Sequence, residues 1–264
     1  MRVYGILHVH TTYSHDGKIN LGELVRLCKA KGYKFLIVTE HAEDMTRDSM
    51  AKFVHECRLL SSEDFVVIPG LEFICGGVHI LGLGIREILH ASSPKALIDK
   101  IHEHNGVAVL AHMSYYEKIP WESLSGLDGV EIWNARYDSR FAPKIRCFRT
   151  LKKLKKFNRG LAGYCGLDLH SHYELGKLSI IFDVKDGKIS SKTILDALKK
   201  GEFEITNGLI TLSQELRIRD EIILILFNSI YYPILLSRKS MAKLFNALGM
   251  KPPEKLLKII KRLF

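Results

Sequence analysis

Short apolar segments alternate with amphipathic segments along most of this chain, and that alternation is the strongest constraint on its fold. Strands are expected over residues 2–7, 34–39, 65–73, 78–83, 107–111, 129–133, 161–166, 178–184 and 202–206. Helices are expected over residues 21–31, 47–60, 94–104, 140–157 and 190–200. Because the expected strands are almost wholly apolar, we predict an α/β fold with parallel strands buried on both faces.

Polar side chains that bind metals or carry protons follow six of the expected strands. They are His8 and His10, Glu40 and His41, Glu72, His112, Asn134, and Asp168 with His170. In a barrel of parallel strands the carboxyl ends of the strands lie on one face, where active sites assemble. The pattern therefore predicts a single site built from several strand ends.

The segment "HVHTTYSHDG" at residues 8–17 is the densest part of this pattern. His-x-His at a strand end places both imidazoles on the same side, because side chains alternate with a period of two. This spacing alone is equally compatible with structural histidines, but Asp168-x-His170 repeats it. Mixed histidine and carboxylate sites suit zinc, manganese or iron better than calcium. Glu72 could bridge two ions about 3.5–4 Å apart, as in many phosphoesterases.

Six sequence blocks resemble, in order, the motifs of the PHP (polymerase and histidinol phosphatase) domain family over about residues 1–210. They read "HVHTTYSHDG", "VTEHAED", "PGLEFICGGVHILG", "LAHMSYY", "VEIWNAR" and "GLDLHSHYELG". The resemblance implies a distorted (β/α)7, TIM-like barrel that holds two or three divalent ions of zinc, manganese or iron. The implied metal ligands are His8, His10, Asp16, His41, Glu72, His79, His112, Asp168 and His170. Within this set, His8, His10, Glu72 and Asp168 are the implied catalytic residues.

Three of these assignments have alternatives. The family usually reads Ser-Asp-Gly where this chain reads "SHDG", so either His15 or Asp16 could be the ligand, and the Asp-Gly pair favours Asp16. The family commonly reads Thr-Asp-His where this chain has Glu40 before the histidine, which suggests that Glu40 only supports a ligand. His79 could instead be a core histidine of the apolar hairpin that the expected strands 65–73 and 78–83 would form around the turn "CGG".

The resemblance implies hydrolysis of a phosphate ester of a small metabolite or a nucleotide by metal-activated water. Arg136 is the candidate phosphate-binding residue, because a guanidinium group matches phosphate in a bidentate way. A surface arginine without a role is the equal alternative, and Arg140 is a weaker second candidate. Tyr115 and Tyr116, which follow His112, are expected either to line the pocket or to cap the barrel.

The chain is expected to divide into a phosphoesterase barrel, residues 1–212, and a helical tail, residues 213–264, that is basic and partly apolar. The apolar stretch 222–236 is shorter than the roughly 20 residues that a membrane-spanning helix needs. Helices are expected over residues 240–248 and 253–264. The tail could pack on the barrel, on a second subunit or on an anionic membrane surface. The net charge of +10 also makes nucleic acid a possible partner.

Two other functional classes compete with the phosphoesterase. An amidohydrolase also carries His-x-His after its first strand, but it typically needs a metal-bridging lysine, and no lysine follows a suitable strand here. A non-catalytic module would bind nucleic acid or membrane through its tail, yet the set of site residues looks complete. Five cysteines without a CxxC pair indicate neither a disulfide framework nor a thiolate zinc site. Together with the lack of a signal segment, they predict a cytoplasmic protein.

Overall fold

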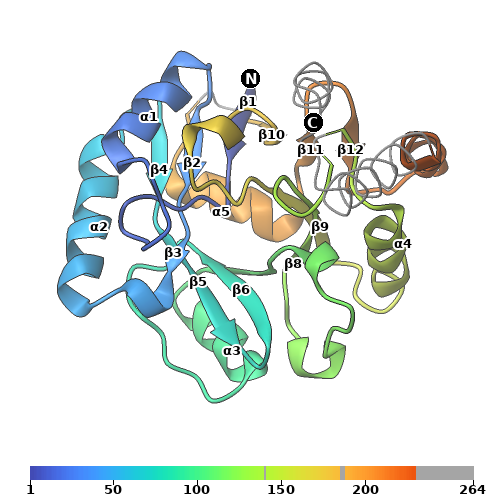
Figure 1. Cartoon of the computed structure of the whole chain (residues 1–264), viewed down its shortest axis with the longest axis horizontal. Helices are drawn as coiled ribbons and strands as arrows, with labels where there is room; N and C mark the ends of the chain where they lie inside the picture. The colour runs from blue at the N-terminus through green and yellow to red at the C-terminus, as the bar shows by residue number, and fades with distance from the viewer. Residues whose placement is uncertain (140, 185–187, 230–264) are drawn as a thin grey trace, which may run out of the picture.

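The chain forms a mixed α/β fold with two six-stranded sheets (Figure 1), which confirms the expected α/β class. This computed structural model describes residues 1–139, 141–184 and 188–229. The strands are β1 (Arg2–Ile6), β2 (Phe35–Ile37), β3 (Glu40–His41), β4 (Val66–Ile68), β5 (Gly70–Cys75), β6 (Val78–Leu83), β7 (Val107–Leu110), β8 (Gly129–Asn134), β9 (Ala162–Gly166), β10 (Ser179–Asp183), β11 (Glu204–Thr206) and β12 (Thr211–Ser213). The helices are α1 (Leu21–Ala30), α2 (Arg47–Leu60), α3 (Pro94–Glu103), α4 (Ile145–Leu154) and α5 (Ser191–Lys200). Short 3-10 helices are η1 (Ala42–Asp44), η2 (Met113–Tyr115), η3 (Trp121–Leu124) and η4 (His172–Glu174).

The first sheet has the strand order β12-β11-β10-β1-β2-β4, and the second has the order β3-β5-β6-β7-β8-β9. The chain passes from one sheet to the other four times, between β2 and β3, β3 and β4, β4 and β5, and β9 and β10. Pro69 separates β4 from β5, because proline has no N–H to donate to a sheet. Beyond the ends of β1 and β9, an isolated parallel bridge joins Val9 to Leu169. A closed barrel stays a prediction, because the regular strand pairs form two sheets.

The expectation of parallel strands is wrong for a large part of both sheets. Strand β6 runs antiparallel to both β5 and β7, and β1, β10, β11 and β12 pair antiparallel in succession. The antiparallel pair of β5 and β6 confirms the hairpin expected around "CGG", where Gly76 and Gly77 both have positive φ, 60° and 78°. The apolar composition of a strand indicates that both of its faces are buried. It does not indicate whether the neighbouring strands are parallel or antiparallel.

Local capping fixes the helices close to their expected ends. Thr46 and Ser49 form a reciprocal capping box at the start of α2, and the Ser93 side chain caps α3 ahead of Pro94. The expected helix over 140–157 is shorter in the structure, where α4 begins at Ile145. Pro143 accounts for the difference, because proline disfavours a helical conformation in the residue before it.

The first part of the expected tail is a helical stretch over residues 218–229 that packs against α4. Glu221 pairs with Arg149 and Lys152 of α4 at 2.8 Å and 3.0 Å, and Leu224 is fully buried. Asn228 accepts a hydrogen bond from the Ile145 N–H. The helices expected over 240–248 and 253–264 lie outside the described residues. Within the described part of the chain, no helix is long and apolar enough to cross a membrane.

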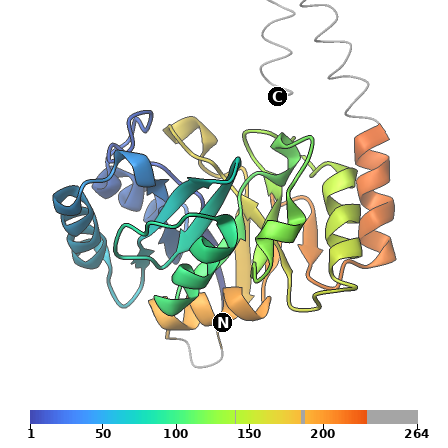
Figure 2. The ribbon, with the colours of Figure 1, turned by 90° about the horizontal axis from the view of Figure 1, so that it is seen from below.

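Helix α5 packs against strands of both sheets, since it contacts β4, β7 and β9. Its Ile194 and Leu198 are fully buried, and the Tyr164 hydroxyl of β9 donates to the Leu198 carbonyl at 2.7 Å. In Figure 2, α5 lies at the end of the molecule that carries the N-terminus, and the loop with η4 lies at the opposite end. The latter end carries the residues expected to form the site.

The close packing of β8 against β9 gives a test of the core. A Cβ at Gly129 would lie 2.1 Å from the Tyr164 ring and 2.8 Å from the Ala162 carbonyl oxygen, and that ring is fully buried. We expect Gly129→Ala to lower the free energy of unfolding in urea by about 1–3 kcal/mol, because overpacking strains the core.

The matched control is Gly22→Ala in α1, where the nearest atom to the new Cβ is the Asn20 side-chain oxygen at 3.7 Å. We expect this variant to be as stable as the parent or more stable by about 0.5–1 kcal/mol, because alanine favours helix. Equal destabilisation of both variants would contradict the packing argument.

Candidate metal centre

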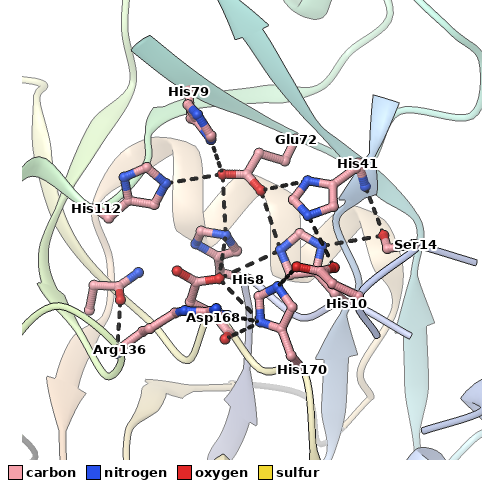
Figure 3. Close-up of polar contacts among 12 residues, drawn as sticks. His8, His10, Ser14, His41, Glu72, His79, His112, Arg136, Asp168 and His170 are labelled. Atoms are coloured by element: carbon pink, nitrogen blue, oxygen red, sulfur yellow. Dashed lines mark hydrogen bonds and ion pairs between the residues drawn. The ribbon is translucent and has the colours of Figure 1, made fainter. Parts of the chain in front are cut away.

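The structure brings all nine predicted metal ligands into one continuous cluster of contacts, most of it shown in Figure 3. His8 and His10 follow β1, His41 lies in β3, Glu72 in β5 and His79 in β6, His112 follows β7, Asp168 and His170 follow β9, and Asp16 lies in the loop before α1. His8 and His10 are fully buried, and most of the other members are buried or nearly so. The cluster thus combines strand ends from both sheets.

Glu72 lies in the middle of this cluster. Its Oε1 lies 2.8 Å from Nδ1 of His79 and 3.2 Å from Nε2 of His112. Its Oε2 lies 3.3 Å from Nε2 of His10 and 3.2 Å from Nδ1 of His41. Burial alone would raise the pKa of Glu72, but the charge of His8 and the neighbouring imidazoles of His10, His112 and His41 hold it well below its usual value. An ionised carboxylate between two groups of imidazoles suits a bridging ligand.

Four sets of ligand atoms are compact enough to hold an ion, and three of them consist only of predicted ligands. These three are His8, His10 and Glu72; His10, His41 and His170; and Glu72, His79 and His112, with all atoms of each set within 4.8 Å of one another. A fourth set consists of His15, Asp16 and His41. Sets of imidazole and carboxylate donors suit zinc, manganese and iron.

Several buried nitrogen atoms of the centre lack a hydrogen-bond partner among the described residues. Such atoms are expected where side chains are arranged to bind a metal ion. They include Nε2 of His8, Nε2 of His10 and Nδ1 of His41. Nε2 of His10 and Nδ1 of His41 lie 3.3 Å and 3.2 Å from Oε2 of Glu72 but are not oriented for a hydrogen bond, and Nε2 of His8 lies 3.6 Å from Oε1 of Glu72. Buried polar atoms are costly without a partner. A divalent cation among these nitrogens and carboxylates would satisfy them, so the residues present fit a metal.

The charges around the cluster lead to the same conclusion. Burial lowers the pKa of His8, but the carboxylates of Glu131, Asp168 and Glu72 together raise it well above the usual value. In the metal-free protein, a proton on His8 therefore offsets part of this buried negative charge. His10 differs, because burial lowers its pKa to about 4 and leaves a neutral ring with a free lone pair. A metal ion would replace the proton on His8 as the compensating cation.

In the loop before α1, the Asp16 side chain pairs with two predicted ligands, whereas the His15 ring stacks on that of His41 with 5.5 Å between centroids. Asp16 lies 3.3 Å from Nε2 of His41 and 2.8 Å from Nε2 of His170. The side chain of His15 is 67% exposed and pairs with Asp44 at 2.8 Å. The geometry therefore favours Asp16 as the ligand of this segment, as the Asp-Gly pair suggested.

Two buried glutamates, Glu131 and Glu40, contact the predicted ligands or residues that hydrogen-bond to them. Glu131 was not among the residues predicted from the sequence. Glu131 is fully buried, and its carboxylate contacts Nδ1 of His8 at 2.8 Å and accepts from the His112 N–H at 2.7 Å. Its sequence signal is an acidic residue inside the apolar strand "VEIW", which is costly unless it is paired. Glu40 accepts hydrogen bonds from Thr11 and Ser14, and Ser14 in turn accepts from the His41 N–H.

Three predicted ligands adopt a backbone conformation that residues other than glycine rarely use. The φ angles are 58° at His8, 30° at His112 and 50° at Asp168. Such conformations cost of order 1–3 kcal/mol each and cluster at functional sites. The Glu131 hydrogen bond to the His112 N–H helps to hold one of them. Residue types and spacing do not reveal these angles.

The loop after β8 carries Arg136 to the edge of the centre, where its Nη1 lies 2.6 Å from Nδ1 of His170. Asn134 accepts from the Arg136 N–H, and Asp138 accepts from the Asn134 N–H. The side chain of Asp138 has no exposed surface, and burial raises its pKa to about 6 although Lys144 lies 3.6 Å away. The predicted phosphate-binding arginine is therefore held by a buried hydrogen-bond network.

Comparisons with known proteins identify relatives of this chain. The sequence profile of a family described as PHP domain matches residues 7–173. The uncharacterised protein MJ1587 of Methanocaldococcus jannaschii is 27% identical over 162 residues, which are 56% of this chain and 91% of that protein. Among solved structures, PsfC from Pseudomonas syringae is similar with a TM-score of 0.56 and 14% identity, covering 89% of this chain and 99% of PsfC. The lesion-specific endonuclease EndoQ from Pyrococcus furiosus has a TM-score of 0.55 and 16% identity, covering 75% of this chain and 56% of EndoQ.

The position of Glu131 predicts a role in metal affinity. In Glu131→Gln the carboxylate charge that holds the His8 ring and favours a nearby cation is lost, while the shape is kept. We expect the affinity for Mn²⁺ or Zn²⁺ to fall about 10–100-fold, measured by competition with a chelator. Glu43→Gln, on the exposed η1, is the matched control. Unchanged affinity in Glu131→Gln would refute the supporting role.

The buried Asp138 predicts a pH-dependent stability. Its folded pKa of about 6 lies above the unfolded value near 4, so the folded state keeps a proton that the unfolded chain loses between these values. The contribution of Asp138 to stability therefore falls as pH rises from 4 to 6. Relative to the parent, Asp138→Asn should gain about 1–3 kcal/mol in free energy of unfolding between pH 4 and pH 7. Urea titrations at both pH values measure this, and parallel profiles would refute it.

Proposed function

Because the chain belongs to the PHP domain family, we propose that it is a metal-dependent phosphoesterase acting on a small metabolite or a nucleotide. The observation that carries the proposal is the buried centre around Glu72, where imidazoles and carboxylates face one another with unpartnered nitrogens. EndoQ, which is similar in fold, is named an endonuclease, a class of enzyme that also cleaves phosphate esters. The family and the donor set thus support the same reaction class.

Two or three divalent ions of zinc, manganese or iron are proposed, held by His8, His10, Asp16, His41, Glu72, His79, His112, Asp168 and His170. The three compact sets that consist only of predicted ligands support this number. When bound, such ions would supply Lewis acidity, which activates water and neutralises charge on phosphoryl oxygens. Glu72, which contacts imidazoles on both of its oxygens, is the proposed bridging residue.

Arg136 is proposed to bind the phosphate of the substrate. Its guanidinium reaches the edge of the centre at His170 while the residue remains exposed to solvent. From this position it can donate two parallel hydrogen bonds to phosphoryl oxygens and offset their charge. The network of Asn134 and Asp138 behind it orients the loop in advance, so little ordering is left for substrate binding.

The finer description of the fold, a distorted (β/α)7 barrel, also belongs to this proposal. Hydrogen bonds from the Leu167 and Leu169 N–H groups to the Leu7 and His8 carbonyls support it, because they link β1 of one sheet to β9 of the other.

The proposal is tested by elemental analysis of the purified protein together with turnover of p-nitrophenyl phosphate and bis-p-nitrophenyl phosphate. We expect the double variant His10→Ala/Asp168→Ala to lose bound metal and at least about 100-fold in kcat/KM, because both residues contribute ligand atoms. The control is His55→Ala on the exposed surface of α2. A parent protein without bound transition metal and without turnover after addition of Mn²⁺ or Zn²⁺ would refute the proposal.

A further inference from the structure

Three tyrosines form a continuous aromatic surface beside the metal centre, called the tyrosine shelf below. It consists of Tyr115 and Tyr116 after β7 and Tyr137 after β8. The ring of Tyr115 lies 5.2 Å from that of Tyr116 and 5.0 Å from that of Tyr137, measured between centroids. The ring of His112 lies 5.0–5.6 Å from those of Tyr137, Tyr115 and Tyr116. The shelf is therefore in direct contact with a predicted metal ligand.

The shelf is held in place by contacts from neighbouring elements. Lys144 donates to the carbonyls of Ser114 at 3.3 Å and Tyr137 at 3.0 Å, so it ties the two loops together. Arg146 of α4 also donates to the Ser114 carbonyl. The Tyr116 hydroxyl accepts from the His79 N–H at 2.8 Å, which anchors it to β6. The two loops and the ring of Tyr116 are thus positioned before any substrate arrives.

The members of the shelf differ in burial, and this difference separates packing from binding. Tyr116 and Tyr137 are partly buried, whereas 57% of Tyr115 is exposed. The ring of Tyr115 packs against those of Tyr116 and Tyr137 and still exposes apolar surface on which another ring can stack. Arg136 directly precedes Tyr137, whose ring lies 5.0 Å from that of Tyr115, so a cationic group that suits phosphate is carried by the loop next to the exposed ring.

We propose that the tyrosine shelf binds a planar aromatic group of the substrate, a nucleobase or an aryl ring, while its phosphate lies at the centre near Arg136. This inference rests on the proposed function of the same site and narrows its substrate class. An aliphatic phosphate ester would leave the exposed face of Tyr115 uncovered. Stacking on tyrosine tolerates different ring systems, because each ring has a π-face, so the shelf selects a class of compound.

The test compares two non-hydrolysable ligands, phenylphosphonate and methylphosphonate, by calorimetric titration into the Mn²⁺-loaded protein. We expect phenylphosphonate to bind at least about fivefold more tightly, the effect of one modest stacking contact. Tyr115→Ala should abolish this preference, and Tyr115→Phe should keep it. Tyr4→Ala, a partly exposed tyrosine on β1, is the control and should keep the preference.

The outcomes separate this inference from the proposed function. Equal affinity for both phosphonates in the parent, no binding of either, or an undiminished preference in Tyr115→Ala would overturn the shelf. Turnover of phenyl phosphate and glycerol phosphate is measured in parallel. Turnover of both with equal kcat/KM and equal phosphonate affinity would reject the shelf and keep the hydrolase. A phosphonate preference without any turnover would keep the shelf and reject the hydrolase. Circular dichroism of Tyr115→Phe and Tyr115→Ala checks that both fold.

Discussion

The pairing of buried carboxylates with imidazoles is the constraint on which the site depends. Glu72 and Glu131 are buried and contact His8, His10, His79 and His112 between them. Buried carboxylates without compensation would be far too costly to retain. The strands that carry them must therefore bring the histidines within contact distance. Positive charge is required at this place whether it arrives as a proton or as a metal ion.

The same pairing also joins the two sheets. Glu131 belongs to β8 of one sheet, and it contacts His8, which follows β1 of the other. The bridge between Val9 and Leu169 lies beside this contact. Gly166 makes room for it, because a Cβ there would lie 1.8 Å from the Glu131 carboxylate. The geometry of the centre and the relation of the sheets are thus set by the same few residues.

The sequence predicted the parts of this structure that depend on residue type and spacing. The α/β class, the hairpin at Gly76 and Gly77 and the gathering of the strand-end histidines follow from periodicity and from where polar residues interrupt apolar runs. Outside this hairpin, strand direction could not be predicted, because an apolar strand is equally well buried by parallel and antiparallel neighbours. The role of Glu131 depends on which side chain it meets 123 residues away, which no local pattern encodes.

The positive φ angles of His8, His112 and Asp168 have a consequence for how this chain can change. Glycine adopts such angles without steric cost, so replacing one of these residues by glycine would remove backbone strain together with a predicted ligand. Loss of the centre would then be accompanied by a gain in the free energy of unfolding, because the backbone strain at that position is relieved. Histidine and aspartate at these three positions oppose the conformational preference of the backbone, and the proposed metal binding gives a reason for their presence that folding alone does not.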